Sequence, residues 1–204
     1  AHLRRDARGR ANWGLGKAPS IDTDTPASAL PRFGLLQVRN GEIDLDDALL
    51  ALTLRASVST QAGTATDRPG AAPAGLQVQA RGSLRNLPLI ADVQSSGVLP
   101  WLRSDGATGT APLRVDLRVG RAHLKLDGQA SDLLQLVGLD AAVELSGPSL
   151  SAVGDTLGLT LPTTAAFDMR GRVRKDGSAW ITDIASWRVG TSRLRGDFRY
   201  DTAS

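Results

Sequence analysis

The stretch Leu113-Arg114-Val115-Asp116-Leu117-Arg118-Val119 alternates apolar and charged side chains at every position. Because successive side chains of a β-strand point to opposite faces, this period of two predicts a strand with one apolar and one polar face. The alternation returns in Phe167–Val173, where Asp168, Arg170 and Arg172 fill the gaps between apolar residues and Gly171. The sequence therefore predicts a row of strands whose apolar face must be covered by something.

Other parts of the chain show the same alternation, separated by turn-forming residues. The further predicted strands cover residues 50–58, 76–84, 89–93, 122–128, 143–145, 180–184 and 194–200, with Trp187 and Val189 just beyond 180–184. Asn40-Gly41 and Asp176-Gly177 predict hairpin turns, since these pairs accept a positive φ. Leu36 and Val38 would precede the first turn, and Ile43 and Leu45 would follow it.

Two segments predict short helices instead of strands. Ser131 and Asp132 can cap the N-terminus of a helix that runs to Val137. A second helix is predicted from Ser149 to Leu157, and it should end near Gly158 because a left-handed residue commonly closes a helix. Two such helices are too short to cover the apolar face of every strand.

The chain is predicted to contain an arm and one domain. Residues 1–32 carry Arg4, Arg5, Arg8 and Arg10 and then a stretch rich in Ser, Thr, Asp and Pro, which is typical of a basic, flexible entry arm. Residues 33–204 form the domain, with a flexible loop at about 60–75. A second loop at 95–111 carries the apolar side chains of Leu99, Trp101 and Leu102.

Composition excludes several classes of protein. The 204 residues have a net charge of +3, 4% aromatic residues and no cysteine, so disulfides, thiolate metal sites and cysteine nucleophiles are ruled out. Small and branched residues must supply most of the buried surface, which suits a sheet better than a thick core. No apolar run reaches membrane-spanning length, so we expect any membrane anchor to lie outside this stretch of chain.

The residues that carry catalysis or bind metals are scarce. His2 and His123 are the two histidines, and His123 falls on the polar side of a predicted strand, where a solvated role is expected. Gly14–Lys17 resembles part of a phosphate-binding loop, but Ala11 and Ala18 stand where that motif needs glycine and Ser or Thr. We therefore expect no enzyme, no cofactor and no metal site; the alternative is a glycan or lipid hydrolase that uses His123 and the Asp44–Asp47 cluster.

Acidic and basic clusters also have simple interpretations. Asp44, Asp46 and Asp47 lack the spacing of a calcium loop and are expected to be an edge-strand and turn cluster. Glu42 and Glu144 are the two glutamates, which leaves little for acid–base pairs.

Arginines gather near the C-terminus at positions 170, 172, 174, 193, 195 and 199. Trp180, Trp187 and Phe198 follow the apolar pattern instead of alternating with these arginines as base-stacking platforms would. We expect a solvated outer face and no nucleic acid, with attraction to anionic lipid headgroups as the functional alternative.

Several motifs resemble the C-terminal part of the AsmA family of bacterial envelope proteins. They are Leu124–Leu133 (LKLDGQASDL), Leu145–Leu150 (LSGPSL), Gly158–Pro162 (GLTLP), Trp187–Phe198 (WRVGTSRLRGDF) and Val38–Ile43 (VRNGEI) followed by Asp46. Their order along the chain carries the resemblance, because none of them is catalytic.

The resemblance implies a location and a function. AsmA-like proteins are anchored to the inner membrane by an N-terminal helix, project into the periplasm and are related to TamB-like and bridge-like lipid-transfer proteins. Their long, bent antiparallel sheet holds acyl chains on its concave face. The resemblance thus implies a periplasmic protein of outer-membrane homeostasis, tethered to the inner membrane in its full length, with phospholipid or another acyl lipid as partner.

These observations predict a mainly β fold: a long, curved antiparallel sheet that forms a taco-like groove, with one or two short helices. We expect the groove to be lined by Leu52, Leu54, Val78, Leu113, Val115, Leu117, Leu126, Phe167, Met169 and Trp180. The predicted function is a lipid-binding or lipid-transfer module. The alternative is a non-enzymatic scaffold for outer-membrane protein assembly that binds envelope proteins through strand edges. A sheet folded on itself as a closed sandwich would favour that scaffold.

Overall fold

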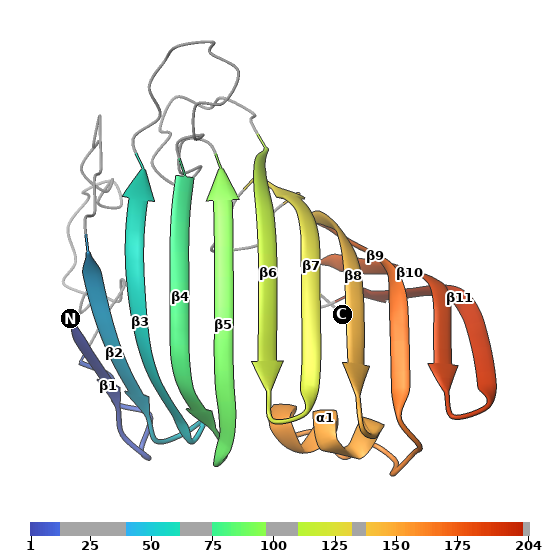
Figure 1. Ribbon diagram of the computed structural model, residues 1–204, viewed down its shortest axis with the longest axis horizontal. Helices are drawn as coiled ribbons and strands as arrows, with labels where there is room; N and C mark the ends of the chain where they lie inside the picture. The colour runs from blue at the N-terminus through green and yellow to red at the C-terminus, as the bar shows by residue number, and fades with distance from the viewer. Residues whose placement is uncertain (13–39, 62–74, 97–109, 132–137, 202–204) are drawn as a thin grey trace, which may run out of the picture.

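The computed structural model describes residues 1–12, 40–61, 75–96, 110–131 and 138–201, and over these residues the chain forms one sheet and one helix (Figure 1). The strands are β1 (His2–Arg5), β2 (Gly41–Asp47), β3 (Leu52–Gln61), β4 (Gly75–Leu84), β5 (Leu87–Ser96), β6 (Ala111–Val119), β7 (Ala122–Ala130), β8 (Asp140–Gly147), β9 (Phe167–Asp176), β10 (Ala179–Val189) and β11 (Ser192–Asp201). The helix α1 (Leu150–Leu157) connects β8 to β9.

The sheet keeps its eleven strands in sequence order, from β1 at one edge to β11 at the other. Every neighbouring pair is antiparallel except β1 and β2, which are parallel. The sheet is open because its two edge strands do not pair with one another, and Figure 1 shows it bending away from the viewer from β9 to β11. The predicted fold class, a curved antiparallel sheet with a short helix, is confirmed.

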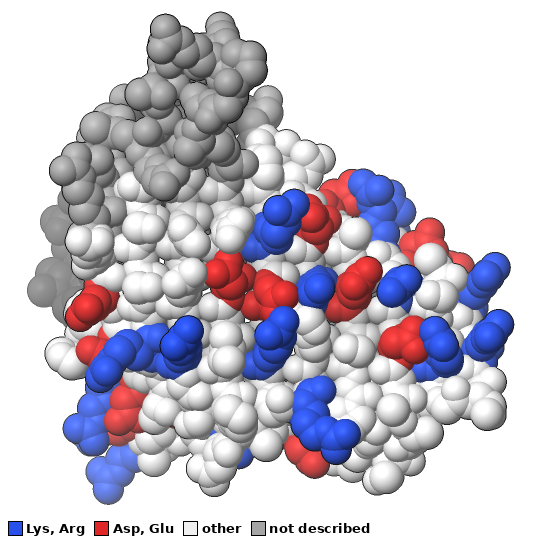
Figure 2. All heavy atoms as spheres, in the orientation of Figure 1, with Lys and Arg blue, Asp and Glu red and all other residues white. Residues whose placement is uncertain are grey.

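Charged side chains gather on one face of this sheet. Figure 2 shows them spread over the face that is turned toward the viewer in Figure 1. Because the sheet bends away from that side, the charged face is convex and the opposite face is concave. The polar side chains of each alternating strand therefore lie on the convex face, and the apolar side chains lie on the concave face.

Glycines permit the tight approach of neighbouring strands on the concave side. A Cβ atom added to Gly128 in β7 would lie 2.2 Å from the carbonyl oxygen of Asp140, and one added to Gly82 in β4 would lie 1.9 Å from that of Thr53. A side chain at either position would collide with backbone, so the strands meet there only because the residue is glycine.

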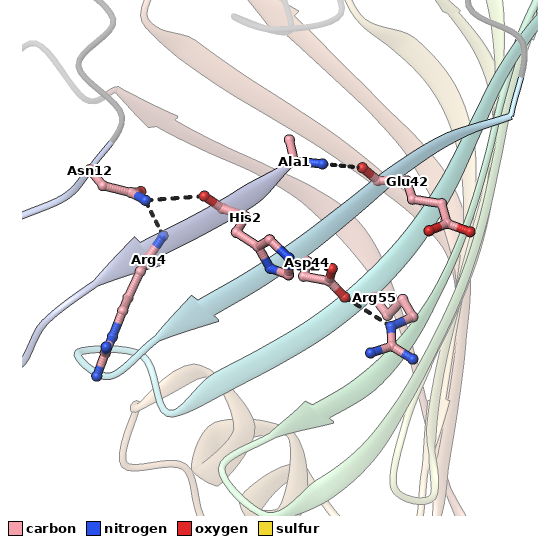
Figure 3. Close-up of polar contacts among 7 residues, drawn as sticks. All are labelled: Ala1, His2, Arg4, Asn12, Glu42, Asp44 and Arg55. Atoms are coloured by element: carbon pink, nitrogen blue, oxygen red, sulfur yellow. Dashed lines mark hydrogen bonds and ion pairs between the residues drawn. The ribbon is translucent and has the colours of Figure 1, made fainter.

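The first residues of the chain belong to the sheet, although the sequence assigned them to an arm. β1 pairs with β2 from His2 opposite Asp44 to Arg5 opposite Asp47. Figure 3 shows the polar contacts that hold it: the Asn12 side chain accepts from the Arg4 amide at 2.7 Å and donates to the His2 carbonyl at 3.0 Å. The four residues of β1 are too few for their alternation to predict a strand. They form one because β2 provides a neighbouring strand to pair with. Residues 13–32 of the predicted arm lie outside the described residues.

The helix α1 confirms the second predicted helix and both of its ends. The Ser149 hydroxyl accepts a hydrogen bond from the Ser151 amide at 3.1 Å, and Gly158 adopts a left-handed φ of 75°. Val153 of α1 lies against the junction of β8 and β9, since a Cβ added to Gly147 would be 3.5 Å from Val153 Cγ2 and 3.0 Å from the Phe167 ring.

Several other predictions fall outside the described residues. They concern the helix at 132–137, the strand before Asn40 with Leu36 and Val38, most of the 60–75 loop, and the apolar residues Leu99, Trp101 and Leu102. Asn40 itself is described and has the positive φ of 54° that a turn before Gly41 requires.

Two boundaries differ from the sequence prediction. Leu50 was placed on the strand with Leu52, but it lies in the β2–β3 turn. Trp187 and Val189 were placed beyond the strand at 180–184, but β10 continues through a register shift between Ile184 and Ser186. The extra residue of such a bulge changes which alternate positions face inward.

Candidate functional site

The concave side of the sheet carries rows of apolar residues that cross from strand to strand. Directly paired residues of antiparallel strands share a face, so the pairing register defines each row. One row is Ile43, Ala56, Ala80, Ala91, Leu117, Leu124, Leu145, Met169, Trp187 and Leu194. The next is Gly41, Val58, Val78, Val93, Val115, Leu126, Val143, Gly171, Ile184 and Gly196. We call the side of the sheet that holds these rows the apolar face.

All ten residues predicted to line the groove lie on the apolar face. Five of them belong to the two rows above: Val78, Val115, Leu117, Leu126 and Met169. The register adds Leu52 opposite Leu84, Leu54 opposite Gly82, Leu113 opposite Gly128, Phe167 opposite Val189 and Trp180 opposite Lys175. Whether these side chains touch lipid stays a prediction.

Burial on the apolar face is deepest in the middle of the sheet. Leu113, Ala130, Leu139 and Ala141 form a buried cluster, against which partly buried Trp180 packs. Among the described residues, however, no large side chain is buried to below 2% exposure, as the interior of a closed sandwich would require. Most leucines and valines of this face are half-buried.

The edge strand β11 has the opposite character. All ten of its residues are exposed, and Leu194, Phe198 and Tyr200 expose 51%, 58% and 56% of their surface. These three side chains are on the apolar face, opposite Trp187, Thr182 and Trp180 of β10. The apolar face thus ends on large side chains that its own sheet leaves exposed.

Sequence reasoning missed two features of this face. The most buried positions include alanines at 56, 80, 111, 130, 141 and 179, which are too small to stand out in a search for large apolar residues. Asp47 is also on this face, opposite Leu52, and is 3% exposed. It was predicted to belong to an edge and turn cluster, and it does stand at the β2–β3 turn.

Arg5 and the β2–β3 turn both bind the Asp47 carboxylate. It accepts from the Leu49 and Leu50 amides at 3.1 Å each and forms an ion pair with the Arg5 guanidinium. The hydrogen bond from Arg5 is the main reason that the pKa of Asp47 lies below its ordinary value. Asp47 therefore joins β1 to the turn and carries its charge at neutral pH.

Cross-strand ion pairs cover the convex polar face. Arg55 donates to Asp44 at 2.8 Å, as Figure 3 shows, and Arg172 donates to Asp140 at 2.8 Å. Each of these arginines lowers the pKa of its carboxylate partner, chiefly through the hydrogen bond. Exposed pairs of this kind fix register more than they stabilise the fold.

The region around His123 consists of surface ion pairs. His123 faces the polar side, as predicted, and its Nε2 lies 2.9 Å from an Asp116 oxygen. The adjacent hollow of 360 Å³ is lined by Lys125, Glu144, Leu145, Ser146, Asp168, Met169, Arg170 and Arg188 along with His123. Its carboxylates face arginines, with Arg188 at 3.0 Å from Asp168 and Arg170 at 3.6 Å from Glu144.

Two further features concern only the described residues. No three histidine, aspartate or glutamate side chains of this part of the chain come together as metal ligands would. No helix in it combines the length and the apolar character needed to cross a bilayer.

Comparison with known proteins finds one similar protein for this chain. The chain is 28% identical over 130 residues to the AsmA family protein YhjG of Escherichia coli (strain K12). This match supports membership in the AsmA family. This match agrees with the resemblance seen in the sequence motifs, and the likeness to the AsmA family supports a role in the bacterial envelope.

The match has a limited extent. It covers 61% of this chain and 18% of YhjG, so the chain spans less than a fifth of that relative's length. No family model matches the chain, and no solved structure matches it.

Proposed function

We propose that the apolar face binds the acyl chains of envelope lipids and that the chain is part of a lipid-binding or lipid-transfer protein of the periplasm. The observation that carries this proposal is the pair of rows that stay apolar or glycine from β2 to β11 on the inside of an open, curved sheet. A surface of this length that is only half-buried attracts a hydrophobic occupant.

An acyl chain suits this surface better than a polar ligand does. The two rows offer methyl and methylene groups with no charged side chain in them, and an alkyl chain needs no hydrogen-bond partner. Burying one leucine or valine side chain is worth about 1.5–3 kcal/mol, so several contacts along a row would hold a lipid without specific recognition. We also propose that the full-length protein is tethered to the inner membrane.

Lipid binding can be tested with a matched pair of variants on β7. Leu126 is on the apolar face and Lys125 is on the polar face of the same strand. The chain would be purified without detergent, analysed by native mass spectrometry, and titrated with a fluorescent fatty acid. We expect co-purified phospholipid and a several-fold weaker fatty-acid affinity for Leu126→Gln, with Lys125→Gln unchanged.

The control for this test is the folded state of each variant, measured by circular dichroism and urea unfolding. A lipid-free chain that binds no fatty acid would overturn the proposal. So would equal effects of the two substitutions, because binding would then not depend on the face.

The second candidate function is a scaffold for outer-membrane protein assembly. The observation that favours it is β11, an edge strand with all ten residues exposed, to which a strand of another protein could add. A proline at Arg195 or Arg199 would block strand addition and leave acyl-chain binding on the central strands intact. Loss of outer-membrane protein assembly together with normal fatty-acid binding would favour this function over the first.

A further inference from the structure

The end of the sheet that carries α1 collects the turns between strands. β2, β4, β6, β8 and β10 run toward this end, along the lower edge in Figure 1, and the next strand leaves from it each time. We define the α1 rim as residues 6–12, 48–51, 85–86, 120–121, 148–166 and 190–191.

Backbone contacts make the α1 rim continuous. The Arg85 amide donates to the Ala51 carbonyl at 2.7 Å, and the Gly120 amide donates to the Pro88 carbonyl at 2.8 Å. The Arg85 guanidinium also reaches α1, because a Cβ added to Gly158 would lie 2.7 Å from one of its nitrogens. The β2–β3 turn, the β4–β5 turn and the end of α1 are therefore neighbours.

Four exposed leucines lie on this rim. Leu49 and Leu50 expose 56% and 44% of their surface, and Leu159 and Leu161 expose 55% and 36%. Half of the large apolar side chains that are exposed in the described part of the chain are thus in its turns and in the segment after α1. Turns normally carry polar residues at such positions, so four exposed leucines there indicate a binding surface.

Asp47 holds one pair of these leucines in place. Its carboxylate accepts from the amides of both Leu49 and Leu50, and the Ala48 amide donates to the Arg5 carbonyl at 2.9 Å. The turn is therefore built around a partly buried ion pair between Asp47 and Arg5, and the two leucine side chains are exposed on it. This anchoring reduces the conformational entropy that binding would otherwise cost.

The charged groups of the rim favour an anionic partner. The described rim residues contain four arginines, Arg8, Arg10, Arg85 and Arg121, and two carboxylates, Asp6 and Asp155. Asp6 is already bound by Arg10 at 2.8 Å. Arg85 is exposed on the β4–β5 turn and Arg121 on the β6–β7 turn. Apolar side chains that insert into a bilayer, flanked by arginines that meet phosphate groups, are the usual composition of an interfacial membrane contact.

We propose that the α1 rim docks on the surface of an anionic phospholipid bilayer, with its four leucines in the acyl region and Arg85 and Arg121 at the headgroups. The last row of the apolar face, Asp47, Leu52, Leu84 and Leu87, ends at this rim. Docking there would bring a lipid to the end of the apolar face, so the inference extends the proposed lipid-binding function and names the surface at which lipid enters or leaves.

The test measures binding of the whole chain to vesicles of equal parts phosphatidylcholine and phosphatidylglycerol by flotation. We expect Leu49→Ser with Leu50→Ser to lower vesicle affinity by about tenfold or more, since two inserted side chains are lost. Ile90→Ser removes a similarly exposed side chain from the polar face of β5, outside the rim and off the apolar face, and should leave affinity unchanged. Arg85→Gln should cost about fivefold on these vesicles and nothing on pure phosphatidylcholine.

A second measurement locates the contact directly. The chain has no cysteine, so a single cysteine can carry a polarity-sensitive dye at a chosen site. The emission of a dye at Leu49→Cys should shift to the blue when vesicles are added, and that of a dye at Arg199→Cys on the polar face of β11 should not.

The outcomes separate this inference from the proposed function. If the leucine variants bind the fluorescent fatty acid normally but lose vesicle binding, the rim and the apolar face have separate roles, as proposed. Failure of the wild-type chain to bind vesicles, or a dye at position 49 that stays in water while the chain binds, would overturn docking at the rim. Loss of fatty-acid binding alone would overturn only the proposed function.

Discussion

The central strands β6–β8 and the edge strand β11 carry the same alternating pattern but bury it to different extents. Leu113 in β6 exposes 7% of its surface, whereas Leu194, on the same face in β11, exposes 51%. Each of the central strands has a partner on both sides and faces the inside of the curve, and β11 has a partner on one side. The alternation therefore determines which side chains face inward, and position in the sheet determines how deeply they are buried.

The largest expected effect on stability comes from replacing Leu113 or Leu194 with alanine. Leu113→Ala should lower the free energy of unfolding by about 2–4 kcal/mol, because it removes buried methyl groups and leaves a cavity. Leu194→Ala should change it by about 0.5 kcal/mol or less, as at other exposed positions. Urea unfolding of the two variants measures the difference. Equal losses would mean that β11 is covered in solution.

Glycine substitution should give the next largest effect. Gly128→Ala would place a Cβ 2.2 Å from the Asp140 carbonyl oxygen, and separating the strands there should cost about 1–3 kcal/mol of unfolding free energy. Gly196→Ala in β11 meets nothing within 4 Å and should be neutral. Unfolding of both variants at the same urea concentration would contradict this prediction. It would mean that the close approach of β7 and β8 does not require glycine at position 128.

Acid should have the smallest effect, and it should act on the central strands. Arg172 lowers the pKa of Asp140 below its ordinary value of 3.8, so the native state favours the charged carboxylate. This stabilisation is complete above the pKa of the unfolded chain and is lost as pH falls through the lower pKa of the folded chain. Asp140→Asn should therefore lower stability at neutral pH and make it less sensitive to acid below pH 4 than the wild type.

Asp197→Asn is the control for the acid experiment, because Asp197 is exposed on β11. Urea midpoints measured from neutral pH downward would show whether only the β8 substitution changes the acid profile. An acid profile of Asp140→Asn that runs parallel to the wild type would show that this ion pair does not contribute.

Much of the fold could be predicted because its signals are local. The alternation in 113–119 defines β6, and the hydroxyl of Ser149 and the left-handed Gly158 define the ends of α1. All ten predicted lining residues share a face because side chains alternate between the two faces of a strand, so strand pairing fixes the face of every residue. What remained beyond prediction depends on contacts between distant residues.

The features that the sequence did not reveal have this non-local origin. β1 becomes a strand because it pairs with β2. The Ala1 ammonium beside it donates to the carbonyl of Glu42, which lies 41 residues later in the chain. The bulge after Ile184, which brings Trp187 onto the apolar face, follows from pairing with Arg170 and Met169. The exposed leucines of the α1 rim come from separate turns, and only the assembled sheet places them at one end.

The most direct test of the central claim is site-specific photo-cross-linking in living bacteria. A photoreactive phenylalanine would replace Val115 or Leu126 on the apolar face and Arg114 or Lys125 on the polar face of the same two strands. Mass spectrometry should find phospholipid attached at 115 and 126 and none at 114 and 125. Cross-links at 115 and 126 that lead only to protein, or lipid attached equally on both faces, would contradict acyl-chain binding by the concave face.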